Sequence, residues 1–268
     1  MFDVAGLQDT RHSVSIEHSG YPLRVKAPEP FVGVIAPAGR RISEYACLHC
    51  PVQKQGMCGA LQGAELARLG DLKYTVHYKR KAVLFDQGEP AESVHIVTEG
   101  GVRLYKTMPD GRRQIIGFAL PGDLLGLAID SRNAYSADAL VNTSACRFSR
   151  KAFGELLDKM PHLIQRLHTM MAHELSIAQD HMMLLGHYSA RQKVAAFVLQ
   201  VRERWRINGA SVHVRLPMSR QDIADYLGMS IETVSRTLGR LERLRLIVVV
   251  PDGVRILDMD RLAKLAGE

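Results

Sequence analysis

Near its C-terminus the chain reads SRQDIADYLGMSIETVSRTLGRLERL over residues 219–244. Ser219 and Asp222, three residues apart, form a capping-box-like start for a first helix. Gly228 supplies the left-handed residue on which such a helix ends, and Ser230 caps a second helix that runs to the end of the stretch. Two short helices joined by a glycine-containing turn are typical of a helix-turn-helix.

The second helix, predicted over Ile231–Leu244, carries a polar face in its first two turns. Glu232, Ser235 and Arg236 share this face through i+3 and i+4 spacing. A recognition helix enters the DNA major groove with this end, where Arg bonds guanine and Glu accepts a hydrogen bond from cytosine. The bland alternative is an exposed ion pair between Glu232 and Arg236. Further predicted DNA contacts flank this face: Ser219, Arg220, Ser230, Thr233 and Arg240. The opposite face is predicted to be core: Val234, Leu238 and Leu241.

An apolar run over residues 246–250, the turn 251–253 and a second run over residues 254–257 predict a β-hairpin after the second helix. A helix-turn-helix followed by a hairpin is a winged arrangement, which weakens the ion-pair alternative. Residues 189–268 hold 14 Lys and Arg against 9 Asp and Glu, so they carry +5 of the formal charge of +7. A basic segment of this kind suits a polyanionic partner.

Short apolar runs punctuated by glycine extend from about Tyr74 to Arg150. Examples are residues 83–85, 94–97, 102–105 and 114–118. Between them stand turn sequences, of which Pro109-Asp110-Gly111 is the clearest. This pattern predicts an antiparallel sandwich or barrel.

A helical pattern follows from about residue 151 to residue 185, with a start predicted at Met160-Pro161. Its apolar residues recur at alternating spacings of four and three, as in a coiled coil, although an ordinary core helix has the same pattern. A neighbouring stripe widens the apolar face: Ile164, Met171, Leu175, Met182 and Leu185. The helix is therefore expected to pack on its own sheet and to pair with a second subunit. The predicted pairing residues are Leu163, Leu167, Met170, Met171, Glu174, Ile177, Ala178, His181 and Leu184.

Cys47, Cys50 and Cys58 form a C-x2-C-x7-C array, and Cys146 lies far downstream. Three bunched cysteines fit a metal or redox site better than a disulfide framework. Four thiolates suit either Zn²⁺ or an iron–sulfur cluster, and the spacing alone does not separate the two. A short amphipathic helix is predicted after the array, around Ala60–Gly70.

Residues 221–228 and 231–236, together with the order of the predicted elements, resemble the CRP/FNR regulators over roughly residues 45–268. The resemblance implies an α+β fold with an N-terminal β-roll like the cyclic-nucleotide-binding jelly roll, a long dimerisation helix and a C-terminal winged helix-turn-helix. The implied divisions are an irregular arm (1–44), the cysteine cluster and β-roll (45–152), the dimerisation helix (153–187) and the DNA-binding domain (188–268).

Within that family, the Glu-x-x-Ser-Arg form at Glu232, Ser235 and Arg236 resembles the FNR/FixK-type readers. It implies a TTGAT–N4–ATCAA-like palindrome, which in turn implies a homodimer. The C-x2-C-x7-C array resembles that of FnrL/FnrN/AadR-like oxygen sensors. That resemblance implies a 4Fe-4S cluster on Cys47, Cys50, Cys58 and Cys146, intact without oxygen and degraded by it, with release of DNA. Family analogy adds RNA polymerase as a partner, contacted by exposed turns around Met108–Arg113.

Two comparisons with the family's branches shape these expectations. Enteric-type FNR proteins carry an acidic residue near the middle of the dimerisation helix, where this chain has Ala178, so its cluster-free form is expected to dimerise more readily. The cyclic-nucleotide branch needs a Gly-Glu and Arg-Ser phosphate cradle. Here Gly122-Asp123 is followed by Asp130-Ser131-Arg132-Asn133 without an Arg-Ser pair, so cyclic-nucleotide binding is disfavoured.

Classes of function other than a regulator would use the same cysteines differently. A redox enzyme would need an open cluster iron and a substrate pocket, and no catalytic constellation is evident. A structural module with a zinc-stapled arm, or a regulator with a zinc or thiol-redox site, uses the same cysteines. A regulator of this family with a small-molecule ligand in place of the cluster is a further alternative. No apolar run approaches the roughly 18–20 residues of a membrane span, and the N-terminus lacks a signal-peptide core. A cytoplasmic protein without enzymatic activity is therefore expected.

Overall fold

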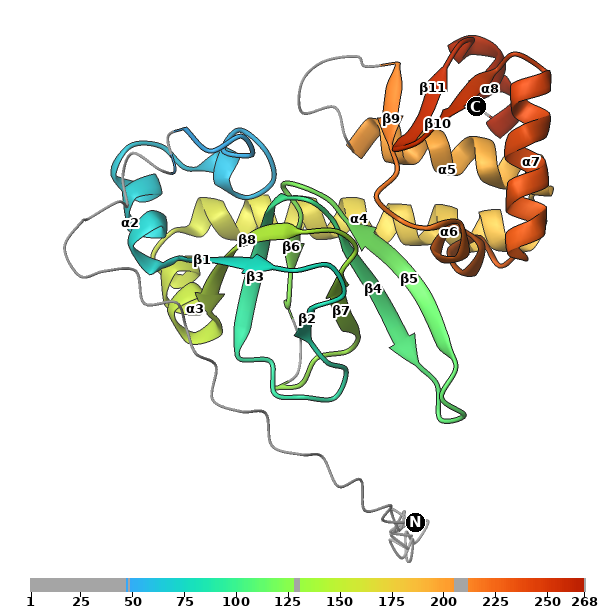
Figure 1. Cartoon of the computed structure of the whole chain (residues 1–268). Coiled ribbons are helices and arrows are strands. Elements are labelled where there is room, and N and C mark those ends of the chain that lie inside the picture. Colours follow the sequence, from blue (N-terminus) through green and yellow to red (C-terminus); the bar gives the residue numbers. More distant parts are fainter. Residues whose placement is uncertain (1–46, 48, 128–130, 205–211, 268) are drawn as a thin grey trace, which may run out of the picture. The chain divides into compact units, whose positions relative to one another are not determined.

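The computed structural model describes residue 47 and residues 49–127, 131–204 and 212–267. Contacts divide the chain into two units, residues 1–40 and residues 41–268. All elements described here belong to the second unit (Figure 1). The irregular arm predicted over residues 1–44 lies outside the described residues. None of the helices in the described part of the chain combines the length and apolar character that crossing a bilayer requires.

The β-roll consists of two four-stranded sheets in which every hydrogen-bonded pair is antiparallel. In spatial order, the first sheet contains β1 (Tyr74–Tyr78), β8 (Thr143–Ser149), β3 (Ser93–Glu99) and β6 (Leu124–Leu125). The second contains β2 (Val83–Phe85), β7 (Ser136–Ala139), β4 (Val102–Thr107) and β5 (Arg113–Ala119). The predicted antiparallel sandwich is confirmed, and the four apolar runs quoted for it form β2, β3, β4 and β5.

The strands with weaker sequence signals form because their surroundings bury them. All four residues of β7 (Ser136–Ala139) are buried between β2 and β4, although the sequence SADA has little intrinsic preference for a strand. The turn between β4 and β5 is the predicted one, with Gly111 at φ 81° and its amide donating to Met108 O at 2.9 Å. One apolar cluster shared by the two sheets contains Phe85, Val97, Val102, Ala119, Leu125 and Ala137.

Two helices follow the β-roll where a single one was predicted over residues 153–187. They are α3 (Arg150–Asp158) and α4 (Pro161–His187). The proline disfavours the helical conformation in the residue before it, and Met160 accordingly has φ −135° and ψ 78°. The predicted start of the long helix at Met160-Pro161 is confirmed, and the predicted segment is corrected to two helices.

The C-terminal region is a winged helix-turn-helix. Its helices are α5 (Ala190–Arg204), α6 (Arg220–Leu227), α7 (Ile231–Arg243) and α8 (Met259–Ala266). Its wing is a three-stranded sheet in the order β10 (Ile247–Val250), β11 (Gly253–Ile256) and β9 (His213–Arg215). The predicted hairpin is β10 and β11. Strand β9 was not predicted, because three residues carry too short a pattern to read.

The segment between the cysteine array and the β-roll contains η1 (Cys58–Ala60), a turn of 3-10 helix, and α2 (Ala64–Leu72). The helix predicted around Ala60–Gly70 therefore begins later. Leu61 is extended, with φ −104° and ψ 142°, and Gly63 has φ 49° and ψ −120°. Neither conformation continues a helix, so the first turn starts only after Gly63.

A fully buried histidine lies in the β-roll. His95 on β3 contacts Tyr78 Oη through Nε2 at 3.1 Å, and its Nδ1 has no hydrogen-bond partner among the described residues. Burial, with a smaller contribution from Arg147, lowers the pKa of His95 from 6.5 to about 4. The imidazole is therefore neutral in the folded protein at pH 7.

The folded-state pKa of His95 lies below its unfolded value, so its neutral form stabilises the fold above pH 6.5. That contribution is lost as the pH falls toward about 4, and a shift of this size corresponds to about 3 kcal/mol. We expect His95→Gln, which cannot titrate but can still bond Tyr78, to flatten the loss of unfolding free energy across this interval. Urea unfolding at several pH values measures it, and equal pH dependence in both proteins would contradict the assignment.

Candidate cysteine site and nucleic-acid interface

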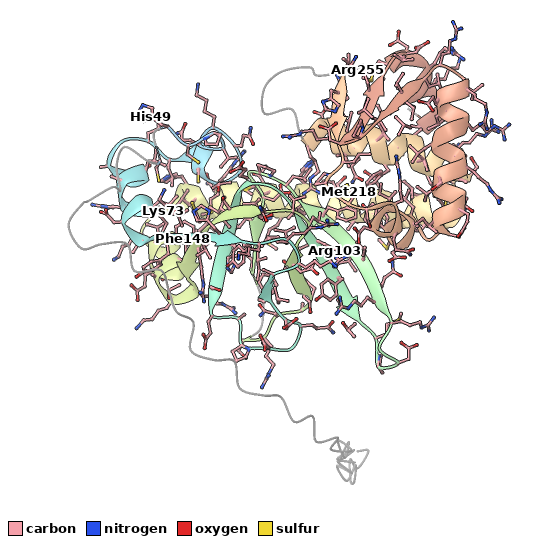
Figure 2. The ribbon with its side chains drawn as sticks, in the orientation of Figure 1. His49, Lys73, Arg103, Phe148, Met218 and Arg255 are labelled. Atoms are coloured by element: carbon pink, nitrogen blue, oxygen red, sulfur yellow. The ribbon has the colours of Figure 1, made fainter. Side chains whose placement is uncertain are left out.

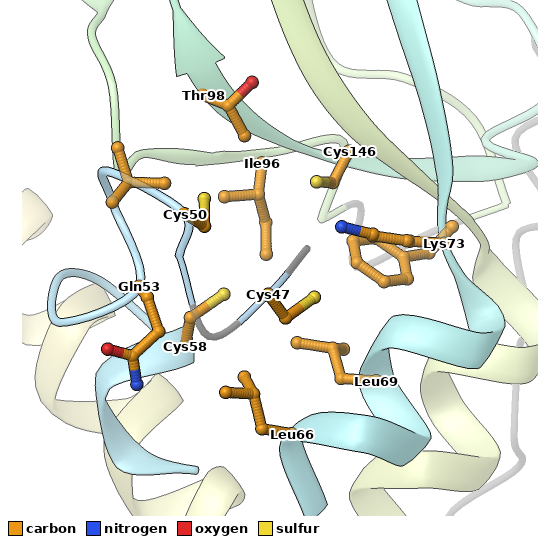
Figure 3. Close-up of a pocket in the computed structure, with 12 residues that line it drawn as sticks. Cys47, Cys50, Gln53, Cys58, Leu66, Leu69, Lys73, Ile96, Thr98 and Cys146 are labelled. Atoms are coloured by element: carbon orange, nitrogen blue, oxygen red, sulfur yellow. The ribbon is translucent and has the colours of Figure 1, made fainter. Parts of the chain in front are cut away.

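All four predicted cysteines line one cavity (Figure 3). Cys47, Cys50 and Cys58 come from the segment before α2, and Cys146 comes from β8. Strand β8 lies between β1 and β3, so Cys146 is held in the middle of a sheet, opposite Ile96. The structure thus brings together thiols that the sequence left far apart.

The loop from Cys50 to Cys58, here called the cysteine loop, is held by turns and by apolar anchors. Backbone amides of Cys50 and Gln53 donate to the carbonyls of Cys47 and Cys50 at 3.3 and 3.0 Å. Val52 and Met57 are each only 1 % exposed. Burial of these two side chains stabilises the position of a loop that has little regular structure of its own.

The electrostatics of the cavity favour neutral thiols. Burial, reinforced by Cys146 and Cys50, raises the pKa of Cys58 to about 12, and burial raises the pKa of Cys146 to about 11. Metal binding requires thiolates. The protein alone does not stabilise the thiolate form, so a bound cation must do so. Such thiols are unreactive as free nucleophiles.

Lys73, which sequence reasoning missed, also lines the cavity (Figure 3). Burial lowers its pKa, but the thiols of Cys146 and Cys47 raise it more, so the pKa of Lys73 lies above its ordinary value. The positive charge of its ammonium group would offset part of the negative charge of four thiolates. No local pattern marked this residue, since it stands out only by its place at the end of α2.

The four thiols suit the two kinds of metal group unequally. Within the described residues, no three His, Cys, Asp or Glu side chains are gathered closely enough to hold one metal ion. A zinc ion with bonds of about 2.3 Å would need its sulfur atoms only about 3.8 Å apart. All four thiols nevertheless line one cavity, and four cysteine thiolates are the ligand set of an iron–sulfur cluster.

The helix-turn-helix has the local geometry that its sequence predicts. The Ser219 hydroxyl accepts from Asp222 N at 3.1 Å, and the Asp222 carboxylate accepts from Ser219 N at 2.8 Å. Gly228 ends α6 with φ 61° and ψ 45°, and Ser230 caps α7 by accepting from Thr233 N at 3.2 Å. The predicted capping box, turn and second cap are confirmed.

The first turns of α7 present the predicted polar face. Glu232, Ser235 and Arg236 are exposed. The pKa of Glu232 is lowered chiefly by its own backbone amide and by Ser230, with only a weaker effect of Arg236. A tight ion pair is therefore not what organises this face. Of the other predicted contacts, Ser219, Ser230 and Arg240 are exposed, and Arg220 and Thr233 are half-buried. The predicted core residues are buried: Val234, Leu238 and Leu241.

The residues predicted to pair subunits divide between two edges of α4. Leu163 and Leu184 are buried within their own chain. His181 stacks on Tyr226 of α6 at 4.0 Å between ring centroids. Half-buried are Leu167, Met170 and Ile177, and exposed are Met171, Glu174 and Ala178. The predicted pairing edge of α4 thus packs mostly on its own chain.

The neighbouring stripe of α4 faces solvent. Its large apolar side chains are exposed: Ile164, Met171, Leu175, Met182 and Leu185. With Ala178 they follow spacings of seven, four, three, four and three, the pattern of a helix that packs along another helix. An exposed apolar stripe of this kind marks an interaction surface.

Comparison with known proteins agrees with both halves of this architecture. A model of the cyclic nucleotide-binding domain matches residues 75–160, and a model of the Crp-like helix-turn-helix domain matches residues 192–265. The chain is 49 % identical to the transcriptional activatory protein AadR of Rhodopseudomonas palustris, over 81 % of this chain and 92 % of that protein. It is 45 % identical to the nitrogen fixation regulation protein FixK of Bradyrhizobium diazoefficiens, over 89 % and 99 %.

Among solved structures, FixK2 from Bradyrhizobium japonicum matches with a TM-score of 0.67 and 36 % identity, over 72 % of this chain and 96 % of that chain. These similarities confirm the predicted α+β architecture and the prediction of a regulator in place of an enzyme. A redox enzyme built on the same cysteines is excluded by the same similarities. The chain belongs to the CRP/FNR family of DNA-binding transcriptional regulators.

Proposed function

We propose that the protein is an oxygen-responsive transcriptional activator that binds DNA as a homodimer while a 4Fe-4S cluster is held by Cys47, Cys50, Cys58 and Cys146. The observation that carries this proposal is the meeting of all four thiols around one buried cavity. The relatives named as activator and nitrogen fixation regulator support an activating output. With DNA as its target, the protein would act in the cytoplasm.

The cluster would supply the oxygen sensitivity, since its iron and sulfide are open to oxidation. The protein's own residues do the rest. Cys146 offers a thiol from a rigid sheet, while Cys47 and the two cysteines of the cysteine loop offer three thiols from turns that apolar contacts hold only in part. Loss of ligation would release the cysteine loop much more than β8. Lys73 would balance part of the negative charge of the thiolates.

On the DNA side, Glu232, Ser235 and Arg236 would read base edges of a TTGAT–N4–ATCAA-like palindrome. Contacts from Ser219, Arg220, Ser230, Thr233 and Arg240 would fix the position of α7 on the duplex. Two-fold symmetry of such a site matches two copies of this chain. Contact with RNA polymerase is proposed by family analogy alone, through the β4–β5 turn at Met108–Arg113.

The exposed stripe of α4 would form the contact between the two subunits. Its large apolar side chains are 38–63 % exposed, and pairing two such helices would bury them. Ala178 lies on this stripe and brings no charge to it. The cluster-free protein is therefore expected to retain some capacity to dimerise.

Other sensors built on the same scaffold are less well supported. A thiol switch needs reactive thiolates, whereas burial holds the pKa of Cys58 and Cys146 well above neutral pH. Zinc needs a tighter thiol set than the cavity provides. A cyclic nucleotide needs the absent Arg-Ser cradle. The arginine in that region, Arg132, instead donates a hydrogen bond to the backbone at Gly88 O, at 2.6 Å.

Cys146→Ser should abolish cluster loading while leaving the winged helix-turn-helix folded. Anaerobically purified wild-type protein should hold about four iron and four sulfide per subunit, bleach in air and lose operator affinity. The variant should hold far less of both elements and show unchanged far-ultraviolet circular dichroism. Thr98→Ser, which alters the same cavity without removing a thiol, is the matched control. Full iron and sulfide in the Cys146 variant would rule this residue out as a ligand.

Arg236→Ala should cost about 1–3 kcal/mol of binding free energy per half-site and relax specificity at one guanine, because a bidentate contact to that base is lost. Titrations of operator and scrambled duplexes with cluster-loaded protein measure the effect. Arg261→Ala removes the same charge from an exposed position on α8, and it should leave specificity intact. Equal weakening on both duplexes would refute a base-reading role for Arg236.

Leu175→Glu should dissociate the dimer, because it puts a charge in the middle of the exposed apolar stripe and opposes it to its own copy. Sedimentation velocity of the cluster-loaded protein, with and without operator, measures the change. Ser176→Glu adds the same charge on an exposed face of α4 that points away from the stripe and should leave the dimer intact. A Leu175 variant that stays dimeric would place the subunit contact elsewhere.

A further inference from the structure

A second, polar pocket lies beside the cysteine site and has no role in the function proposed so far. It is lined by parts of the cysteine loop, of the turn before β6, of α4 and of the C-terminal end of α5. The lining residues that matter here are Gln55, Gly56, Gly122, Asp123, Glu174 and Arg204. Because these come from four elements, the pocket is where the sensor loop, the long helix and the DNA-binding domain meet.

The first contact joins the cysteine loop to the turn over residues 121–123. Gly56 lies so close to this turn that a Cβ atom on it would collide with the Gly122 carbonyl. A Cβ atom on Gly122 would lie 2.9 Å from Gln55 Oε1. Arg166 on α4 donates from Nε to Gly56 O at 3.0 Å. Since backbone rests directly on backbone here, a shift of the cysteine loop changes a contact that the turn makes.

The second contact joins that turn to the DNA-binding domain. Asp123 Oδ2 accepts from its own turn, at Leu120 N, at 2.7 Å and from Arg204 Nη2 at 2.6 Å. The same guanidinium nitrogen reaches Glu174 Oε1 on α4 at 3.4 Å. The side chains of Asp123 and Arg204 are only 26 % and 22 % exposed, so the pair is poorly screened by solvent.

Helix α5 carries this contact into the domain that reads DNA. Its residues Val194, Phe197, Val198 and Val201 belong to the same apolar core as α6 and α7. A displacement of Arg204 would therefore act on α5 and, through this shared core, on α6 and α7. The path from Cys58 to α7 runs through a backbone contact, one ion pair and one packed helix.

We propose that the Asp123–Arg204 ion pair transmits the state of the cysteine loop to the DNA-binding domain, with Asp123 and Arg204 as positioning residues. With the loop seated on the Gly122 turn, the carboxylate is held where Arg204 can reach it. When the loop leaves, the turn relaxes and the ion pair that positions α5 is weakened. The ion pair is intact when the loop is seated and weakened when the loop is displaced. A difference of this kind between two states is what coupling between two sites requires.

This proposal rests on the proposed function of the cysteine site, and its test separates the two. The quantity measured is the ratio of operator Kd without the cluster to operator Kd with it, for anaerobic full-length protein. Iron and sulfide contents are determined for each sample. In the wild-type protein we expect a ratio of about 5–150, the usual range of coupling between sites. In Asp123→Asn the cluster should load normally and the ratio should fall to about one.

A second contact between the β-roll and the DNA-binding domain provides the matched control. Arg103 on β4 (Figure 2) donates to Asp138 of the β-roll and, from Nη1, to Asp222 of α6 at 2.5 Å. It does not line the cysteine cavity or the polar pocket. Arg103→Gln should change both Kd values together and leave their ratio as in the wild type. A general loosening of the domain would move both variants alike.

Arg204→Met carries the test if Asp123→Asn fails to load iron, because Arg204 belongs to α5 and not to the turn that touches the cysteine loop. It should also bring the ratio to about one. Arg204→Lys, which keeps the charge, should restore part of the coupling. A wild-type ratio in both cluster-loaded variants, Asp123→Asn and Arg204→Met, would overturn the relay. Iron-free wild-type protein would instead overturn the proposed function. Val52→Asp, which puts a charge at a buried anchor of the cysteine loop, would then replace cluster loss as the perturbation, and the same ratio would decide the relay.

Discussion

The apolar cluster beneath the cysteine loop is the interaction on which the rest of the structure depends. Met57 and Leu61 from the loop region pack with Ile96 and Phe148 of the first sheet, and the same cluster continues into α2, α3 and the start of α4. Because apolar burial is the main stabilising term in a fold, this contact places three cysteines beside Cys146 without regular structure to hold them. The sensor loop, the sheet and the long helix are therefore parts of one packed body.

That same burial governs the chemistry of the site. Burial raises the pKa of Cys58 and Cys146, and Lys73 offsets only part of this effect. A cation that binds there must stabilise the thiolate forms, so folding of the loop and loading of metal are linked. A loop held half by apolar anchors and half by ligation suits a sensor, since removing the ligation leaves it less stable than the sheet on which it rests.

Helix α4 occupies the place where these local events meet the DNA-reading domain. One edge is buried in its own chain at Leu163 and Leu184, and His181 stacks on a tyrosine of the helix-turn-helix. The other edge leaves an apolar stripe for a second subunit. Predicting both edges from periodicity was possible, but assigning them was not. A heptad pattern shows that residues share a face of the helix, and it does not show which face meets the helix's own sheet.

Many helix caps, turns and chain breaks of this protein could be predicted from local sequence. The caps at Ser219 and Ser230, the left-handed Gly228, the break before Pro161 and the glycine turns of the β-roll depend on interactions within a few residues, so the sequence by itself determined them. Only the tertiary structure decided which elements meet: that Cys146 joins the other three thiols, that Lys73 faces them, and that Asp123 reaches Arg204. Those contacts follow from strand pairing and packing between distant segments, whose energies no local pattern records.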